Sequence, residues 1–81
     1  MALDLQGIDL ALLPVLHDLL HTRSTTLTAR RLRCTQSSVS HSLARLRKQF
    51  DDPLLVRVGR SLATTRFAEE LAPRLGQEAN A

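Results

Sequence analysis

The sequence has very few aromatic residues, a single cysteine and no long apolar run. With two Phe, no Tyr and no Trp among 81 residues, the core of so small a domain must consist mainly of Leu and Val, which leaves little room for a deep catalytic cavity. No stretch approaches the roughly 20 apolar residues of a membrane span. The start MALDLQGIDL lacks the basic region of a signal peptide, and the lone Cys34 has no partner for an internal disulfide. These absences favour one small domain that works in the reducing cytoplasm.

Positive charge is concentrated in the middle of the chain. Residues 23–66 hold ten of the eleven basic residues and two of the eight acidic ones, a net charge of +8, whereas both flanking segments are acidic. This distribution is typical of a surface that binds a polyanion, although an ordinary solvated basic face has the same composition. Ten of the eleven basic residues are Arg, whose planar guanidinium suits phosphate groups and guanine edges better than the Lys ammonium does.

The first expected helix covers residues 10–21, with Asp9 as its N-cap. Pro14 lies near the end of the first turn, where a missing N–H does least harm, and we expect some local distortion there. The helix is apolar on two sides and therefore needs two partners; we expect the second partner to be another chain. The predicted dimer contacts are Leu12, Val15 and Leu19 on this helix and Phe67, Leu71 and Leu75 on the last helix.

Two helices joined by a three-residue turn are expected next. The first covers residues 27–33 and is capped by Thr26, with Ala29 and Leu32 facing inward. Two basic residues on this helix, Arg30 and Arg31, either solvate it or contact phosphate.

The turn at residues 33–35 leads into the clearest element of the chain, a helix over residues 36–50. Thr35 is its N-cap, and we expect Cys34 to fill the turn as a small apolar plug, with a redox-sensing role as the alternative. One narrow apolar stripe runs along this helix at i, i+4, i+7 and i+11. The stripe consists of Val39, Leu43, Leu46 and Phe50.

A hairpin and a fourth helix follow, after residues 51–53 stop the third helix. Residues 54–58 and 62–64 are typical of two short strands, with a tight turn between them. Thr65 can cap the fourth helix, which Pro73 should kink or shorten. The predicted fold is mainly α, a winged helix-turn-helix with a three-helix core, a short β-hairpin wing and a C-terminal linker helix. We expect residues 1–65 to form this winged helix-turn-helix domain, and residues 66–81 to begin the linker and dimerisation helix.

The second helix of such a pair is the one that enters the major groove. The outer surface at the N-terminal end of residues 36–50 carries small hydroxyls, an imidazole and an amide. The small residues let the helix backbone approach the base edges closely. Gln36 can pair with adenine, Ser37 and Ser40 with either type of base, and His41 with a base or a phosphate. The predicted DNA-binding residues are Arg33, Thr35, Gln36, Ser37, Ser38, Ser40, His41, Arg45, Arg57 and Arg60.

The wing supplies the last two of these residues. Gly59 allows a tight turn, which places Arg60 at the hairpin tip, where it can reach a narrow A·T-rich minor groove. Arg57 is better placed for the DNA backbone. The alternative is that Arg60 is only a solvated turn residue.

From about residue 8 to residue 75, the sequence resembles the LysR-type bacterial transcriptional regulators. The resemblance rests on the run TARRLRCTQSSVSHSLARLR followed by DDPLLVRVGRSLATT. Its specific elements are Thr35-Gln36, Val39-Ser40, Pro53-Leu54, Arg57 and Gly59-Arg60, and their combination is far more specific than any one of them. The segments SHSLARLR and DDPLLVRVGR are most similar to the branch of the family that contains nodulation and aromatic-catabolism activators.

The resemblance implies several properties of the protein. It implies sequence-specific binding of double-stranded promoter DNA at interrupted dyad sites, a homodimer formed through the helix after the wing, and a tetramer in a full-length protein. It also implies a C-terminal effector-binding domain, which these 81 residues do not include, so that a small-molecule effector acts only through that missing domain. We therefore expect an excised DNA-binding module, or alternatively a truncated natural protein, that acts in the bacterial cytoplasm and on the nucleoid when bound.

Other functions find less support in the sequence. His17 and His21 have a spacing that can bind zinc, but no third ligand is evident, so we expect no metal and no cofactor. The Ser residues of the third helix have no acid–base partner and no glycine-rich elbow, so we expect no enzyme activity. The main alternative is a winged-helix adaptor that binds protein, which would tend to fill positions 37, 40 and 41 with bulky apolar or acidic residues.

Overall fold

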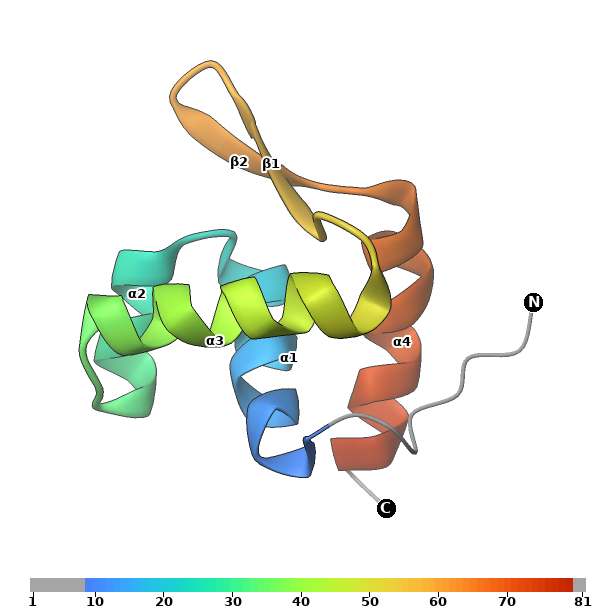
Figure 1. The fold of residues 1–81 in the computed structure, drawn as a ribbon, viewed down its shortest axis with the longest axis horizontal. Helices are drawn as coiled ribbons and strands as arrows, with labels where there is room; N and C mark the ends of the chain where they lie inside the picture. The colour runs from blue at the N-terminus through green and yellow to red at the C-terminus, as the bar shows by residue number, and fades with distance from the viewer. Residues whose placement is uncertain (1–8, 80–81) are drawn as a thin grey trace.

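The computed structural model describes the backbone of residues 9–79 and the side chains of residues 9–75. Helix α3 crosses α1, and the two strands form a hairpin that projects away from the helices (Figure 1). The predicted winged helix-turn-helix fold is confirmed. The outer ends of both predicted domains, residues 1–8 and 80–81, lie outside the described residues. In chain order the elements are η1 (Leu10–Leu12), α1 (Leu13–Thr22), α2 (Thr25–Leu32), α3 (Gln36–Phe50), β1 (Leu55–Val58), β2 (Ser61–Thr64) and α4 (Arg66–Ala79).

The first predicted helix begins with a 3₁₀ turn, η1, before it continues as α1. Asp9 is the N-cap, as predicted, because its Oδ1 accepts a hydrogen bond from the backbone N–H of Ala11 at 3.0 Å. Pro14 lies in the first turn of α1, where no intrahelical hydrogen bond needs its missing N–H. The change from 3₁₀ to α geometry is thus the local distortion expected around Pro14.

Helix α2 begins two residues earlier than predicted. Its N-cap is Ser24, whose Oγ accepts a hydrogen bond from the N–H of Leu27 at 3.1 Å, so the assignment of Thr26 as the cap is wrong. Both hydroxyl residues are good caps by residue type, but Ser24 has the extended backbone that an N-cap requires, with a φ of −148° and a ψ of 121°. Ala29 is buried as predicted, but Leu32 is 37% exposed. The last residue of α2 faces an open groove and not the core.

Helix α3 has the predicted bounds and the predicted cap. The Oγ1 of Thr35 accepts a hydrogen bond from the N–H of Ser38 at 3.0 Å. Three residues of the apolar stripe, Val39, Leu43 and Leu46, are at least 95% buried. The stripe packs α3 against α1 and α2, so the polar face of the helix is held toward solvent.

The hairpin is antiparallel and pairs all four residues of each strand. Gly59 and Arg60 form its two-residue turn, and Gly59 has a φ of 62°, which glycine adopts without steric cost. The first strand begins at Leu55, one residue later than predicted. Leu54 has a φ of 65°, outside the range of a strand, and its side chain is fully buried.

Helix α4 packs against α1 and closes the core. Thr65 caps it as predicted, since its Oγ1 accepts a hydrogen bond from the N–H of Ala68 at 3.1 Å. The expectation that Pro73 shortens the helix is wrong, because α4 continues to Ala79. Leu71 and Leu75, on either side of Pro73, are at least 98% buried, and their packing maintains the helix across the missing hydrogen bond.

Most side chains predicted as dimer contacts belong to the core of a single chain. Helix α1 packs against α2, α3 and α4, so its second apolar face is covered within the chain. The argument that this face needs another chain is therefore wrong, while the dimer itself stays a prediction. Leu12, Leu19, Leu71 and Leu75 are more than nine-tenths buried, and Val15 and Phe67 are partly buried.

Candidate nucleic-acid interface

Every side chain predicted to contact DNA is exposed to solvent. Most of them lie on the first turns of α3 and in the turn before it, and two lie on the wing (Figure 1). The buried stripe on the opposite side of α3 fixes the orientation of this surface. The structure thus brings the predicted residues to accessible positions on two neighbouring elements, and their individual contacts stay predictions.

Gln36, the first residue of α3, is held by α2. Its side-chain Nε2 donates a hydrogen bond to the Oγ1 of Thr25 at 3.1 Å, which restricts the rotamers of an otherwise exposed amide. Bidentate pairing with adenine uses the amide carbonyl and one N–H. A primary amide has two N–H groups, so the bond to Thr25 leaves the second one for a base.

Arg45 lies further along α3 and has an acidic neighbour. Its Nη2 is 3.6 Å from the Oδ2 of Asp9, and both side chains are about half exposed. An exposed pair of this kind contributes little to stability, because water and salt screen it. Arg45 can therefore exchange this carboxylate for a phosphate at small cost.

Arg47 is also on α3, but its guanidinium donates hydrogen bonds to backbone carbonyls of the same chain. The Nε donates to the carbonyl oxygen of Pro53 at 2.8 Å, and the Nη2 donates to that of Leu55 at 2.9 Å. These bonds fix the start of the wing against the end of α3. Nothing in the sequence distinguishes Arg47 from the arginines whose guanidinium groups make no hydrogen bond to the backbone.

Asp52 forms a second attachment of the wing. Its Oδ2 accepts a hydrogen bond from the N–H of Leu54 at 2.8 Å and another from the Oγ1 of Thr65 at 2.7 Å. Asp52 thereby joins the end of α3, the start of β1 and the N-cap of α4. The sequence assigned this residue only to the stop of the third helix.

Arg31 is a structural residue as well. Its Nε lies 2.7 Å from the Oδ1 of Asp18, and the Asp18 side chain is only 11% exposed. The ion pair connects α2 to α1, which favours a structural role for Arg31 over the predicted alternative of a phosphate contact. Arg30 remains exposed. Cys34 is also exposed, so the expectation that it plugs the turn is wrong.

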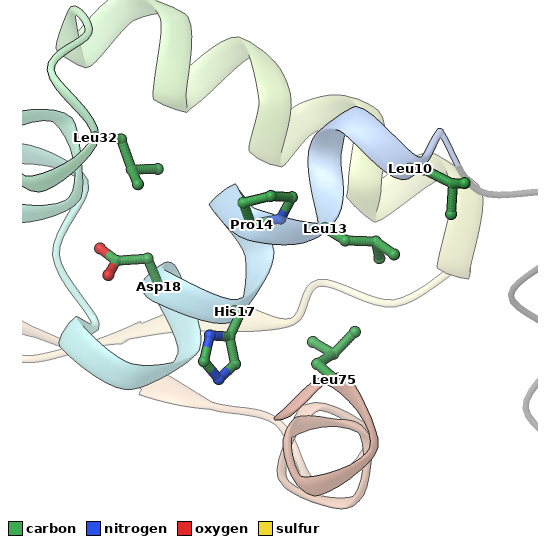
Figure 2. A pocket seen from close by; sticks show the side chains of 7 residues that line it. All are labelled: Leu10, Leu13, Pro14, His17, Asp18, Leu32 and Leu75. Carbon is green, nitrogen blue, oxygen red and sulfur yellow. The ribbon is translucent and has the colours of Figure 1, made fainter. Parts of the chain in front are cut away.

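An apolar groove lies between η1, α1, the end of α2 and α4 (Figure 2). None of its lining residues belongs to α3 or to the wing. Leu10 is 70% exposed at one end of it, and Leu32 lies at the other. The Oδ2 of the buried Asp18 at its edge has no hydrogen-bond partner among the described residues. The remaining lining residues are Leu13, Pro14, His17 and Leu75.

The part of the chain that the structure describes has neither a cluster of metal-ligating side chains nor a helix that could span a membrane. Within the described part of the chain, no three His, Cys, Asp or Glu side chains come close enough to hold a metal ion. His17 and His21 are both exposed. None of the helices within residues 9–79 is long and apolar enough to cross a membrane.

Two helices joined by a tight turn and followed by an antiparallel hairpin define the winged helix-turn-helix class of proteins. Residues 10–69 match the family described as "Bacterial regulatory helix-turn-helix protein, lysR family". The chain therefore belongs to this family of transcription regulators and corresponds to its DNA-binding domain. The family is not one of enzymes, and the resemblance found in the sequence is confirmed.

Curated relatives agree with this assignment. The chain is 44% identical over 69 residues to the HTH-type transcriptional regulator PhcA of Ralstonia nicotianae, covering 85% of this chain and 20% of that protein. It is 44% identical over 70 residues to nodulation protein D 3 of Rhizobium meliloti, covering 86% of this chain and 22% of that protein. The chain thus spans about a fifth of the length of the relatives it matches.

Solved structures show the same fold. A probable transcriptional regulator of Pseudomonas aeruginosa, PA0477, superposes with a TM-score of 0.87 at 36% identity, covering 93% of this chain and 25% of that one. The BenM_DBD/catB site 1 DNA complex superposes with a TM-score of 0.82 at 20% identity, covering 90% of this chain and 82% of that one. At this low identity, the second match shows the fold alone.

Proposed function

We propose that this chain binds double-stranded DNA sequence-specifically as the DNA-binding module of a LysR-type regulator in the bacterial cytoplasm. Helix α3 lies in the major groove, and the wing lies at the adjacent minor groove. The observation that carries this proposal is the exposed, small and polar N-terminal half of α3 beside a hairpin with two arginines. The BenM domain, which was crystallised as a DNA complex, has the same fold.

The competing function is a protein-binding adaptor. Such an adaptor would bury its partner against bulky apolar or acidic side chains on α3. This chain has Ser37, Ser40 and His41 at those exposed positions, and none of them offers a large apolar contact. The residues of α3 therefore favour DNA.

We propose further that the chain binds DNA as a homodimer, with the two recognition helices about 34 Å apart, one turn of the duplex. The apolar groove supports this arrangement, because its lining combines the exposed Leu10 with Leu75 of α4, the helix that follows the wing. In a longer protein we propose a tetramer, and a small-molecule effector that acts through a further domain.

Selection from random duplex DNA tests the proposed function. We expect an enriched consensus with two inverted half-sites about one helical turn apart. Affinity for this consensus should fall steeply with salt, because each arginine–phosphate contact releases counterions and contributes about −0.9 to the slope of log K against log [salt]. Fluorescence anisotropy at a series of salt concentrations measures the slope. Affinity that is independent of salt, with no enriched sequence, would favour the adaptor.

Replacing Arg60 tests the wing. Arg60 is exposed at the hairpin tip, and a narrow A·T-rich minor groove has the more negative potential. We expect Arg60→Ala to weaken binding more on a consensus with A·T-rich flanks than on one with G·C-rich flanks. Arg57→Ala, on the strand, is the matched control and should weaken both alike. An equal loss on the two probes for Arg60→Ala would remove minor-groove recognition from the mechanism, and no loss on either probe would leave Arg60 as a solvated turn residue.

A further inference from the structure

A second groove, polar and basic, separates the α1–α2 turn from the wing. It brings together the end of α1, the first residues of α2 and both strands, which are far apart in the sequence. Arginine and hydroxyl side chains dominate its lining, and the lining contains no carboxylate. The lining residues are Thr22, Arg23, Ser24, Thr25, Arg57, Arg60, Ser61 and Leu62.

The positive charge of this groove is not neutralised within the described residues. Ion pairs in residues 9–75 involve Arg31, Arg45 and Arg66, and the side-chain bonds of Arg47 go to carbonyl oxygens. In the same part of the chain, the guanidinium groups of Arg23, Arg57 and Arg60 have neither an ion pair nor a hydrogen bond. Three like charges around one groove repel one another, so an anion between them stabilises the arrangement.

The position of the groove identifies the anion. Where a recognition helix lies in the major groove and a wing in the adjacent minor groove, one sugar–phosphate strand must pass between them, because that strand separates the two grooves. The polar groove lies between the helix-turn-helix and the wing. Hydroxyl groups and the N–H groups at the start of α2 add neutral donors of the kind that phosphate contacts use.

We infer that Arg23, with Arg57, holds the phosphodiester backbone of the DNA strand that separates the two grooves. This inference rests on the proposed function and adds Arg23, in the α1–α2 turn, to the DNA-binding surface. Arg60 lies at the hairpin tip and lines the same polar groove of the protein. In the proposed complex it reaches the minor groove of the DNA. The phosphates of one strand thus connect the contacts of the wing with those of α2.

Arg23→Gly is the variant of choice, because the backbone of Arg23 has a φ of 56°, which glycine adopts readily. Losing one phosphate contact should make the slope of log K against log [salt] shallower by about one. The ratio of Kd at 200 mM salt to Kd at 50 mM salt then falls about fourfold. Arg57→Gln, a second variant in the groove, should have the same effect. Circular dichroism establishes that both variants are folded.

Arg66→Ala is the control, because it removes one positive charge from an exposed ion pair on α4, away from the groove. It should leave the slope unchanged. Equal changes for Arg23→Gly and Arg66→Ala would show an effect of net charge alone and overturn the inference, as would an unchanged slope for Arg23→Gly. Failure of the unaltered chain to bind any duplex would instead overturn the proposed function and the inference together.

Neutral phosphates locate the contact on the DNA. Single methylphosphonate substitutions along the selected consensus should weaken binding of the unaltered chain at a phosphate between the two grooves. They should have a smaller effect there on Arg23→Gly, in which Arg57 still lines the polar groove. Equal sensitivity of both proteins at every position would contradict the inference. Competition by inorganic phosphate beyond that of sodium chloride at equal ionic strength would indicate a site for a free anion and contradict it as well.

Discussion

Replacing Asp52 with alanine is expected to lower the free energy of unfolding by about 2–4 kcal/mol, because hydrogen bonds to a charged acceptor contribute about 1.5–3 kcal/mol each and this carboxylate is partly exposed. The substitution removes the acceptor for the N–H of Leu54 and for the hydroxyl of Thr65. Leu54 has a φ of 65°, a strained conformation that the surrounding bonds must hold in place. Urea denaturation followed by circular dichroism measures the loss.

Two amide substitutions distinguish the contribution that the hydrogen bonds of Asp52 make to stability from the contribution of its charge. Asp52→Asn keeps an oxygen acceptor, so we expect about half the loss seen with alanine. Asp51→Asn removes the same charge from the exposed neighbour, whose left-handed φ of 52° asparagine tolerates. It should have little effect on stability. A loss for Asp51→Asn as large as that for Asp52→Ala would show that charge, and not the attachment of the wing, is responsible.

The sequence predicted α3 completely because several signals agree there. The apolar stripe, the capping Thr35 and the acidic stop all indicate one element, and the structure has these bounds. The start of α2 was missed because Ser24, Thr25 and Thr26 are three consecutive residues of similar capping ability. The ends of α1 and α2 were each missed by one residue, because the left-handed positions that commonly hold glycine are occupied there by Arg23 and Arg33.

The exposed face of α3 could be predicted because burial of one stripe determines what lies opposite. The roles of individual arginines could not, because they depend on contacts between distant segments. Arg31 reaches Asp18, thirteen residues away, and Arg47 reaches carbonyl groups beyond the end of its helix. The packing of the second apolar side of α1 could not be predicted for the same reason, since periodicity shows that α1 has two apolar sides but not which helices of the same chain cover them. The dimer itself stays a prediction.

The largest effect on DNA recognition is expected from Gln36→Ala. Loss of a bidentate base contact costs about 1–3 kcal/mol, roughly five- to 150-fold in affinity, on the consensus obtained by selection. On duplexes without the consensus, the loss should be small, because phosphate contacts dominate there. Thr25→Val removes the hydroxyl that accepts from the Gln36 amide, so it should lower affinity for the consensus by a smaller factor.

Gln49→Ala is the matched control, since Gln49 is an exposed glutamine on the last turn of the same helix. It should change neither the affinity for the consensus nor the affinity for duplexes without the consensus. Arg45→Ala should weaken both kinds of duplex alike, because a phosphate contact carries no sequence information. The same loss for Gln36→Ala on every duplex would indicate that Gln36 contacts the DNA backbone and not a base. Ser40 would then be the next candidate for base recognition, because the two residues are one turn apart on the exposed face of α3.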